Sequence, residues 1–482
     1  MRIYNSLKRT KEEFVPIEEG KVKLYACGIT VYNDCHIGHA RQAITYDMVS
    51  QYLRYKGYDV TYARNYTDVD DKIIEKANEL GMNALDYSEQ KIREAEEDLA
   101  GLGVLDADIK PKASENIDNI VEFVSKLIEK GHAYPADNGD VYFSVDSFPS
   151  YGKLSNRNVD DLIDGVRKNV EEGKRDPKDF ALWKSAKEGE IFWESPWGKG
   201  RPGWHIECSA MILNSLGETI DIHGGGKDLV FPHHENEIAQ SEALTGKPFV
   251  NYWTHNGLIK VNGQKMSKSL GNSLTIKQVL ELYNKEVIRY AMLSKHYSSD
   301  LDLNEKEFAI AEKHMYYFHN SLKSINEFLE GADLSNEIVN TDNDPAIVEN
   351  FTEAMDDDFN SALALSHLFT VFKLANSLLK NKKDASVLKK IRDEVIDTYK
   401  ILGILQEDSE TFIDELKNKY LAKLELDTAK VEEQIEQRAN AKAEKQYDVA
   451  DGIRKELDEQ GIILNDAKDK TTWDIKELYN IT

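Results

Sequence analysis

Cysteine is scarce in this chain. Only three of its 482 residues are cysteines, namely Cys27, Cys35 and Cys208. An odd and small number of cysteines argues against a disulfide scaffold and is typical of a reducing compartment, so we expect a cytoplasmic protein. Metal binding or a reactive thiol stays open for some of them, and Cys35 is interpreted as a spare thiol without such a role.

Long apolar segments are also missing. The first nine residues have no apolar stretch of the kind found in a secretory signal, and no apolar run approaches the length that spans a membrane. We therefore expect no membrane partner. Hydrophobic residues still make up 41% of the chain, which supports a buried core, and 482 residues predict several domains.

Basic residues are outnumbered. The chain has 61 Lys and Arg against 86 Asp and Glu, a formal net charge of -25. Proteins that bind nucleic acid usually carry a basic surface, so this balance counts against an RNA partner unless a specific feature outweighs it.

The most informative stretch is Tyr25–Arg41. Alternating residues before it predict a strand that ends near Cys27, and a loop containing Gly28 leads into a helix that ends at Gly57. His36 and His39 then lie at the first turn of that helix, where unpaired N–H groups and the helix dipole favour phosphate. Gly38 between them would let a nucleotide approach the backbone. The alternative is that both histidines only cap or pack the helix.

Polar residues and glycines follow two further predicted strands. Thr67 begins a polar segment after a strand over residues 59–66, where open α/β sheets bind ligands, although an ordinary helix cap also explains it. A strand over Thr219–His223 runs into a loop whose backbone can lie against a ligand. That loop consists of Gly224, Gly225, Gly226, Lys227 and Asp228.

A basic, hydroxyl-rich loop is predicted after a strand over Asn256–Val261 and a hairpin turn at Asn262-Gly263. It contains Lys265, Met266, Ser267, Lys268 and Ser269 and is bounded by glycine. The alternative is a solvated surface loop without a function.

Four separated residues suggest a metal site. We place Cys27 and Cys208 at strand ends, which converge in a doubly wound sheet, and His233 and Glu237 four residues apart on one helix. Two thiolates, an imidazole and a carboxylate are a plausible zinc set. His234, three residues before Glu237, fits nearly as well, and Cys208 can also be an ordinary buried residue.

These motifs occur together in one order: Cys27, His36-Ile37-Gly38-His39, Pro232-His233-His234-Glu235-Asn236-Glu237 and Lys265-Met266-Ser267-Lys268-Ser269. In this combination the chain closely resembles the cysteinyl-tRNA synthetases of the class I aminoacyl-tRNA synthetase family, over essentially its whole length. The resemblance implies activation of L-cysteine with ATP to cysteinyl-adenylate, then transfer to the 3'-terminal adenosine of tRNA(Cys).

The resemblance also implies an architecture. We expect an α/β, doubly wound, Rossmann-type parallel-sheet catalytic domain with an inserted connective subdomain, an all-α helical bundle and a small C-terminal anticodon-binding module. The expected ranges are 1–111 and 201–250 for the two halves of the catalytic domain, 112–200 for the insertion, 251–303 for the subdomain with the basic loop, 304–405 for the bundle and 406–482 for the last module.

Residue roles follow from the same resemblance. Cys27, Cys208, His233 and Glu237 would hold one zinc ion, with His233 preferred over His234, and the zinc would bind the substrate thiolate. His36, His39, Lys265 and Lys268 would act on the ATP phosphates, with Mg²⁺ assisting. Gly38, Ser267, Gly224, Gly225, Gly226 and Asp228 would complete the ATP site; Thr67 and Trp204 would wall the cysteine pocket, and Thr30 would lie near the amino acid backbone.

The residues that contact tRNA and the choice among related functions stay open. Trp473 and Arg438 are guesses for stacking and charge toward tRNA, and ordinary packing explains them equally well. A cysteine ligase acting on a small amine, or a non-catalytic zinc or nucleotide-binding module, shares parts of the pattern. The chain continues well past the helical bundle, which favours tRNA, and we expect a monomer.

Overall fold

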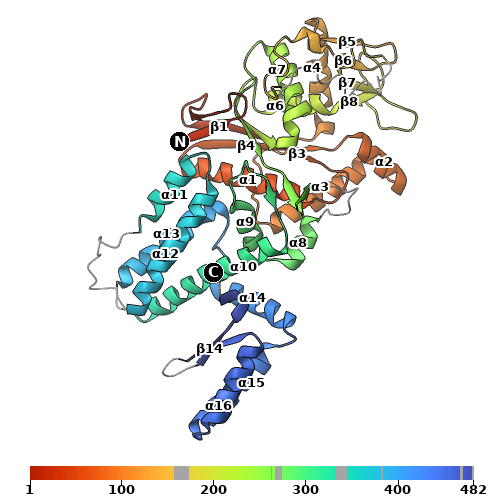
Figure 1. The fold of residues 1–482 in the computed structure, drawn as a ribbon. Helices are drawn as coiled ribbons and strands as arrows, with labels where there is room; N and C mark the ends of the chain where they lie inside the picture. The colour runs from red at the N-terminus through yellow and green to blue at the C-terminus, as the bar shows by residue number, and fades with distance from the viewer. Residues whose placement is uncertain are drawn as a thin grey trace. The chain divides into compact units, whose positions relative to one another are not determined.

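The computed structural model describes residues 1–156, 173–261, 263–265, 274–332, 345–381, 384–466 and 471–479. The chain forms two compact units (Figure 1). The first unit comprises Met1–Leu282, Lys295–Asp302 and Ala354–Asn360, and the second comprises Tyr283–Ser294, Leu303–Glu353 and Ser361–Thr482.

A four-stranded parallel sheet forms the centre of the first unit. Its strand order is β10-β9-β3-β4, where the strands are β3 (Lys21–Thr30), β4 (Asp59–Thr67), β9 (Ile220–Gly226) and β10 (Val250–Asn256). Of these four strands, β3 comes first in the sequence. It has β4 on one side and β9 on the other, so the strand order reverses beside it. Open α/β sheets bind ligands at such a point. The predicted doubly wound fold is confirmed.

Helices cover both faces of this sheet. On one face, Tyr46 of α1 (Ile37–Tyr55) donates to the carbonyl of Thr254 at 2.8 Å and accepts from the Gly225 N–H at 2.8 Å. On the other face, α6 (Trp204–Ser215) and α7 (Glu235–Thr245) contribute Met211 and Ile238 to a core that includes Tyr25 and Trp253. This double covering buries both faces of the strands, as parallel sheets require.

An insertion separates β4 from α6 and shares one hydrophobic core with α6 and α7. Helix α4 packs against a four-stranded antiparallel sheet, β5-β6-β7-β8, through buried residues such as Phe123, Leu182 and Trp183. Figure 1 shows these strands beside α4, α6 and α7. The bounds are α2 (Asp71–Leu80), α3 (Ala84–Gly101), α4 (Ile117–Glu129), β5 (Ala133–Pro135), β6 (Val141–Phe143), β7 (Phe180–Ser185) and β8 (Gly200–Pro202).

A small sheet carries the basic loop. Strand β11 (Ile259–Val261) pairs with β12 (Gln264–Lys265) and with β13 (Leu301–Asp302), so the strand expected over Asn256–Val261 is divided between β10 and β11. Ser267 and Lys268 lie outside the described residues. Beyond the loop the chain returns to the start of α1, where the Ile37 N–H donates to the Leu274 carbonyl at 3.0 Å.

The second unit is mainly helical and ends in a short hairpin. Its helices are α9 (Lys285–Leu293), α10 (Glu305–Glu330), most of α11 (Ile347–Asp356), α12 (Ser361–Asn381), α13 (Ala385–Tyr399), α14 (Ser409–Lys423), α15 (Thr428–Ala443), α16 (Tyr447–Glu459) and α17 (Lys476–Tyr479). Helix α8 (Ile276–Leu282) belongs to the first unit. Strands β14 (Ile462–Asp466) and β15 (Thr471–Ile475) pair with each other, and β1 (Arg2–Asn5) pairs with β2 (Thr10–Glu13) in the first unit.

One described helix, α12, is long and apolar enough by length and composition to cross a membrane. The expectation that no run reaches this length is therefore wrong. The helix packs within the second unit, where Phe372 lies 5.3 Å from Phe318 of α10, ring centre to ring centre. Buried core helices pass the same test of length and composition, so the finding is weak evidence for a membrane.

Candidate active site and metal centre

A cavity of about 170 Å³ opens where β3 and β4 end and where α1 and α6 begin. Drug-sized ligands occupy about 300–1,000 Å³, so this space suits a much smaller molecule, such as an amino acid. The lining includes Thr30, Thr67, Trp204, Asp228, His39, Cys27, Cys208 and His233. Three substrate residues and three metal ligands expected from the sequence thus border one cavity.

The four expected metal ligands come together beside this cavity. Cys27 on β3, Cys208 on α6, His233 and Glu237 each offer one atom, and these atoms all lie within 4.8 Å of one another in buried positions. The two thiol sulfurs are 3.9 Å apart and form no disulfide. Nε2 of His233 lies 3.0 Å from Oε1 of Glu237. This is a donor set that zinc prefers.

The element that carries Cys208 differs from the expectation. The sequence analysis places Cys208 at the end of a strand, but the strand β8 ends at Pro202 and helix α6, which carries Cys208, begins at Trp204. Every residue from Ile206 to Ile212 is buried, so this helix is buried on nearly all sides and shows no exposed face in this stretch. A short piece of such a helix cannot be told from a buried strand by periodicity.

A second set of ligands overlaps the first. Cys27, His223, His234 and Glu237 also offer four atoms within 4.8 Å of one another. Nε2 of His234 lies 3.3 Å from the Cys27 sulfur. By geometry, either His233 or His234 can supply the nitrogen ligand. The set with two thiolates is the more typical zinc set.

Three other imidazoles surround the cluster, and the sequence analysis missed them. Nδ1 of His205 lies 3.0 Å from Nδ1 of His233, and Nε2 of His255 lies 2.9 Å from Nδ1 of His234. His223 contacts Glu237. A histidine that binds a metal through one ring nitrogen is usually held in place by a hydrogen-bond partner on the other nitrogen. Nδ1 of His233 and Nδ1 of His234 both have such a partner. Only the position of His223, directly before three glycines, could have singled it out.

Burial and close contacts set the charges of the cluster. The pKa of Cys208 is lowered to about 6, chiefly because Cys27 donates a hydrogen bond to its sulfur, whereas burial raises the pKa of Cys27 well above its ordinary value. Burial alone would raise the pKa of Glu237, but His223 and His233 hold it well below its usual range. These contacts favour the anionic forms of Cys208 and Glu237, and although burial lowers the pKa of His233, the charge of Glu237 in turn raises that pKa to about 10.

His36 and His39 lie at the first turn of α1, as expected. Nδ1 of His36 accepts from the Gly38 N–H at 3.1 Å, and Nδ1 of His39 accepts from the His36 N–H at 3.3 Å. The two rings stack with centres 3.7 Å apart. Both histidines therefore cap the helix, so the capping interpretation holds, and His39 also lines the cavity.

Comparisons with known proteins decide the family. A family model for the class I (C) tRNA synthetase catalytic domain matches residues 13–313, and a DALR domain model matches residues 350–406. The cysteine–tRNA ligase of Geobacter metallireducens is 50% identical over 486 residues, covering 99% of this chain and 100% of that protein. The chain belongs to the cysteine–tRNA ligase family. The ligase of Marinobacter nauticus is 48% identical over 473 residues, covering 98% and 99% of the two chains.

Solved class I synthetases share the fold of this family member. Methionyl-tRNA synthetase of Mycobacterium tuberculosis in complex with methionyl-adenylate matches with a TM-score of 0.58 at 14% identity, over 82% of this chain and 93% of that one. The Agrobacterium radiobacter K84 LeuRS–tRNA–LeuAMS complex matches with a TM-score of 0.59 at 11% identity, over 84% and 86%. The predicted family and the predicted enzyme class are confirmed.

The three glycines of this synthetase lie inside β9 rather than in a loop. A Cβ at Gly224 would lie 2.1 Å from the Tyr46 ring, and one at Gly225 would lie 2.7 Å from the His234 ring. A Cβ at Gly226 would lie 2.4 Å from Oδ1 of Asp228. The Tyr46 and His234 rings therefore explain the absence of a side chain at Gly224 and Gly225, whereas at Gly226 the exposed Asp228 side chain can move aside. Contact of these glycines with adenosine stays a prediction.

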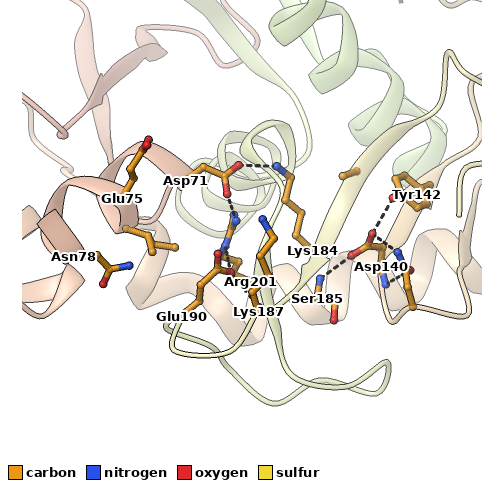
Figure 2. Close-up of a pocket in the computed structure, with 13 residues that line it drawn as sticks. Asp71, Glu75, Asn78, Asp140, Tyr142, Lys184, Ser185, Lys187, Glu190 and Arg201 are labelled. Carbon is orange, nitrogen blue, oxygen red and sulfur yellow. Dashed lines mark hydrogen bonds and ion pairs between the residues drawn. The ribbon is translucent and has the colours of Figure 1, made fainter. Parts of the chain in front are cut away.

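A second cavity of this synthetase, about 640 Å³, lies between α2 and strands β6–β8 (Figure 2). At its edge the Asp71 carboxylate binds Lys184 Nζ at 2.9 Å and also the guanidinium of Arg201, which is buried. Asp71 follows Thr67 by four residues, and Arg201 precedes Trp204 by three. The Asp71–Arg201 ion pair thus joins the two segments that carry Thr67 and Trp204, which both line the smaller cavity.

The two residues guessed for tRNA contact have structural partners. Nη1 and Nη2 of Arg438 bind the two carboxylate oxygens of Asp466, each at 2.8 Å, and the Arg438 side chain is buried. Nζ of Lys417 lies 4.4 Å from the centre of the Trp473 ring. These contacts favour the packing interpretation, most clearly for Arg438.

Proposed function

We propose that this synthetase activates L-cysteine with ATP and transfers it to tRNA(Cys), and that a zinc ion selects cysteine through its thiolate. The observation that carries the proposal is the buried cluster of Cys27, Cys208, His233 and Glu237 at the wall of a cavity of amino acid size. The near full-length identity to cysteine–tRNA ligases supports the same reaction.

The donor set fits zinc because it offers two sulfurs, one nitrogen and one oxygen within 4.8 Å. When bound, zinc supplies a Lewis acid that favours thiolate over thiol at neutral pH. A serine hydroxyl stays protonated and binds zinc poorly. A hydrophobic pocket rejects a near-isostere only about a hundredfold, so recognition through sulfur gives far better discrimination and makes an editing site unnecessary.

The cavity residues would hold the rest of cysteine. Trp204 and Thr67 border the cavity and would wall the side chain, and Thr30 would lie near the amino acid backbone. Asp228 and Gly224–Gly226 are proposed for adenosine. These residues position the cysteine carboxylate for attack on the α-phosphate, a step in which orientation supplies much of the rate.

The phosphate site is proposed at the start of α1. His36, Gly38 and His39 stand at its positive end. Lys265 ends β12, and Ser267 and Lys268 of the basic loop follow it in the sequence. The return of the loop beside Ile37 supports this proximity. Cationic groups and N–H donors would stabilise the charge that develops on the α-phosphate. Mg²⁺ is proposed as the ion that accompanies ATP, with no protein ligand assigned.

Transfer to tRNA is proposed for the second step, with residues 406–482 as the anticodon-binding module. A monomer is proposed. The three free cysteines support the cytoplasm.

Two assays in series test this function. Cysteine-dependent exchange of pyrophosphate into ATP reports the first step, and charging of purified tRNA(Cys) reports the second. We expect both. Exchange without charging would instead favour a ligase for a small amine, and no exchange would favour a non-catalytic module.

A further inference from the structure

Strand β3 contains an irregularity at the cysteine that faces the cluster. Its pairing with β4 passes from Ala26–Arg64 directly to Ile29–Tyr66, so Cys27 and Gly28 lie opposite the single residue Asn65. Its pairing with β9 ends at Ala26. This is a β-bulge, a feature that commonly re-aims a side chain beside an active site.

Two side chains take over the hydrogen bonds that the bulge removes from the sheet. The Gly28 N–H donates to Oδ1 of Asn65 at 2.8 Å, and Nε2 of Gln42, on α1, donates to the Cys27 carbonyl. Asn65 is 1% exposed. Buried backbone groups without a partner cost stability, so these two bonds are what allow the bulge to persist.

Glycine is also required inside the bulge. A Cβ on Gly28 would lie 1.5 Å from the backbone oxygen of Asn65, so the two strands approach too closely for any side chain there. The consequence reaches the cavity: Cys27, Gly28, Ile29 and Thr30 all line it. A regular strand turns alternate residues to opposite faces and would not present four consecutive residues to one cavity.

We propose that Asn65 and Gln42 are positioning residues that hold this bulge and thereby aim the Cys27 thiol at the metal. Both also line the cavity, so they act where the thiol and the substrate meet. The proposal rests on the function proposed above, because it assigns these residues to the zinc ligand Cys27. Partners that orient a metal ligand typically change metal affinity about 10–100-fold when they are removed.

The test uses the full-length protein with Asn65→Ala and Gln42→Met, each studied alone. Gln42→Met keeps the length of the side chain and removes the donor. We expect zinc affinity, measured by competition with a chromophoric chelator, to fall at least tenfold in each variant. We also expect the absorption bands of the Co²⁺-loaded protein to shift, and KM for cysteine to rise about tenfold while KM for ATP changes less than twofold.

Gln51→Met is the matched control, because Gln51 lies on the same helix and outside the cavity. It should leave zinc affinity and the Co²⁺ spectrum unchanged. Unchanged zinc affinity and spectrum in Gln42→Met would overturn the inference even if Asn65→Ala failed to fold. A wild-type protein that binds neither Zn²⁺ nor Co²⁺ would instead overturn the zinc part of the proposed function, so the two failures are distinguishable.

Discussion

Nε2 of His223 lies 2.9 Å from Oε2 of Glu237, while the other carboxylate oxygen faces His233 at 3.0 Å. The two histidines therefore contact different oxygens of one carboxylate, and all three side chains are buried. The contact from His223 leaves Oε1 directed toward the thiols, where Cys27 lies 3.6 Å away. A carboxylate held in this way has a fixed orientation toward a metal.

We predict that His223→Phe lowers zinc affinity about 10–100-fold, because the ring volume stays while the hydrogen bond to Glu237 is lost. Chelator competition measures the effect. His132→Phe, in the insertion and away from the cluster, serves as the control and should bind zinc like the unchanged protein. Equal zinc affinity in His223→Phe and wild type would show that Glu237 needs no such partner.

We predict that His39→Ala lowers the rate of cysteine-dependent pyrophosphate exchange at least a hundredfold, the usual cost of losing a group that stabilises developing charge. Zinc content should not change, because His39 is not among the cluster residues. Lys268→Ala, in the loop outside the described residues, should lower the exchange rate to a similar extent and also leave the zinc content unchanged. Loss of zinc in either variant would mean that these roles are wrongly assigned.

We predict that Cys208→Ser removes the zinc and abolishes the preference for cysteine over serine in pyrophosphate exchange. Cys35→Ser is the matched control. Cys35 is buried and, chiefly through burial, its pKa is raised to about 12, so it is an inert thiol outside the cluster. A metal-free Cys208→Ser protein that still selects cysteine would contradict the proposed role of the metal.

A buried carboxylate in the second unit predicts a pH-dependent stability. Glu286 is 1% exposed; burial raises its pKa, but hydrogen bonds from His319 and from the Gln406 and Glu407 N–H groups outweigh burial and hold the pKa below its ordinary 4.5. A lowered pKa means that the charged form stabilises the fold above pH 4.5 and that this stabilisation is lost as the pH falls further.

Glu286→Gln should therefore lower the free energy of unfolding by about 2 kcal/mol at pH 7, the usual contribution of hydrogen bonds to a charged group. The difference from wild type should shrink as the pH falls below 4.5. Urea unfolding at several pH values measures this. Glu281→Gln, at an exposed position, is the control. A difference that stays constant or grows toward low pH would contradict the assignment.

The sequence predicted the parts of the site that depend on local pattern. Cys27 directly follows the alternating residues of β3, although that strand continues to Thr30 and does not end near Cys27 as expected. His233 and Glu237 are four residues apart and lie in contact, as their spacing predicts. The His36 and His39 pair followed from the change of period after Gly38. These features depend on neighbouring residues in the chain, and the structure brings them to one edge of the sheet.

The rest depended on contacts between distant segments. The role of Asn65 opposite Gly28 follows from strand register, and that of His223 beside Glu237 follows from the packing of α7 on β9; neither follows from spacing along the chain. Cys208 was placed on the wrong element because a buried apolar helix has the composition of a buried strand. The glycines of β9 were interpreted as a ligand-binding loop. The Tyr46 ring that crowds Gly224 belongs to a helix distant in the sequence, so the sequence did not indicate that contact.

The central claim is that substrate sulfur binds at the cluster of Cys27, Cys208, His233 and Glu237. The most direct measurement is the absorption spectrum of the Co²⁺-loaded protein during titration with L-cysteine and, separately, with L-serine. The account predicts that cysteine strengthens the sulfur-to-cobalt charge-transfer bands to saturation, whereas serine leaves them unchanged. Bands that ignore cysteine, or that respond equally to serine, would contradict it.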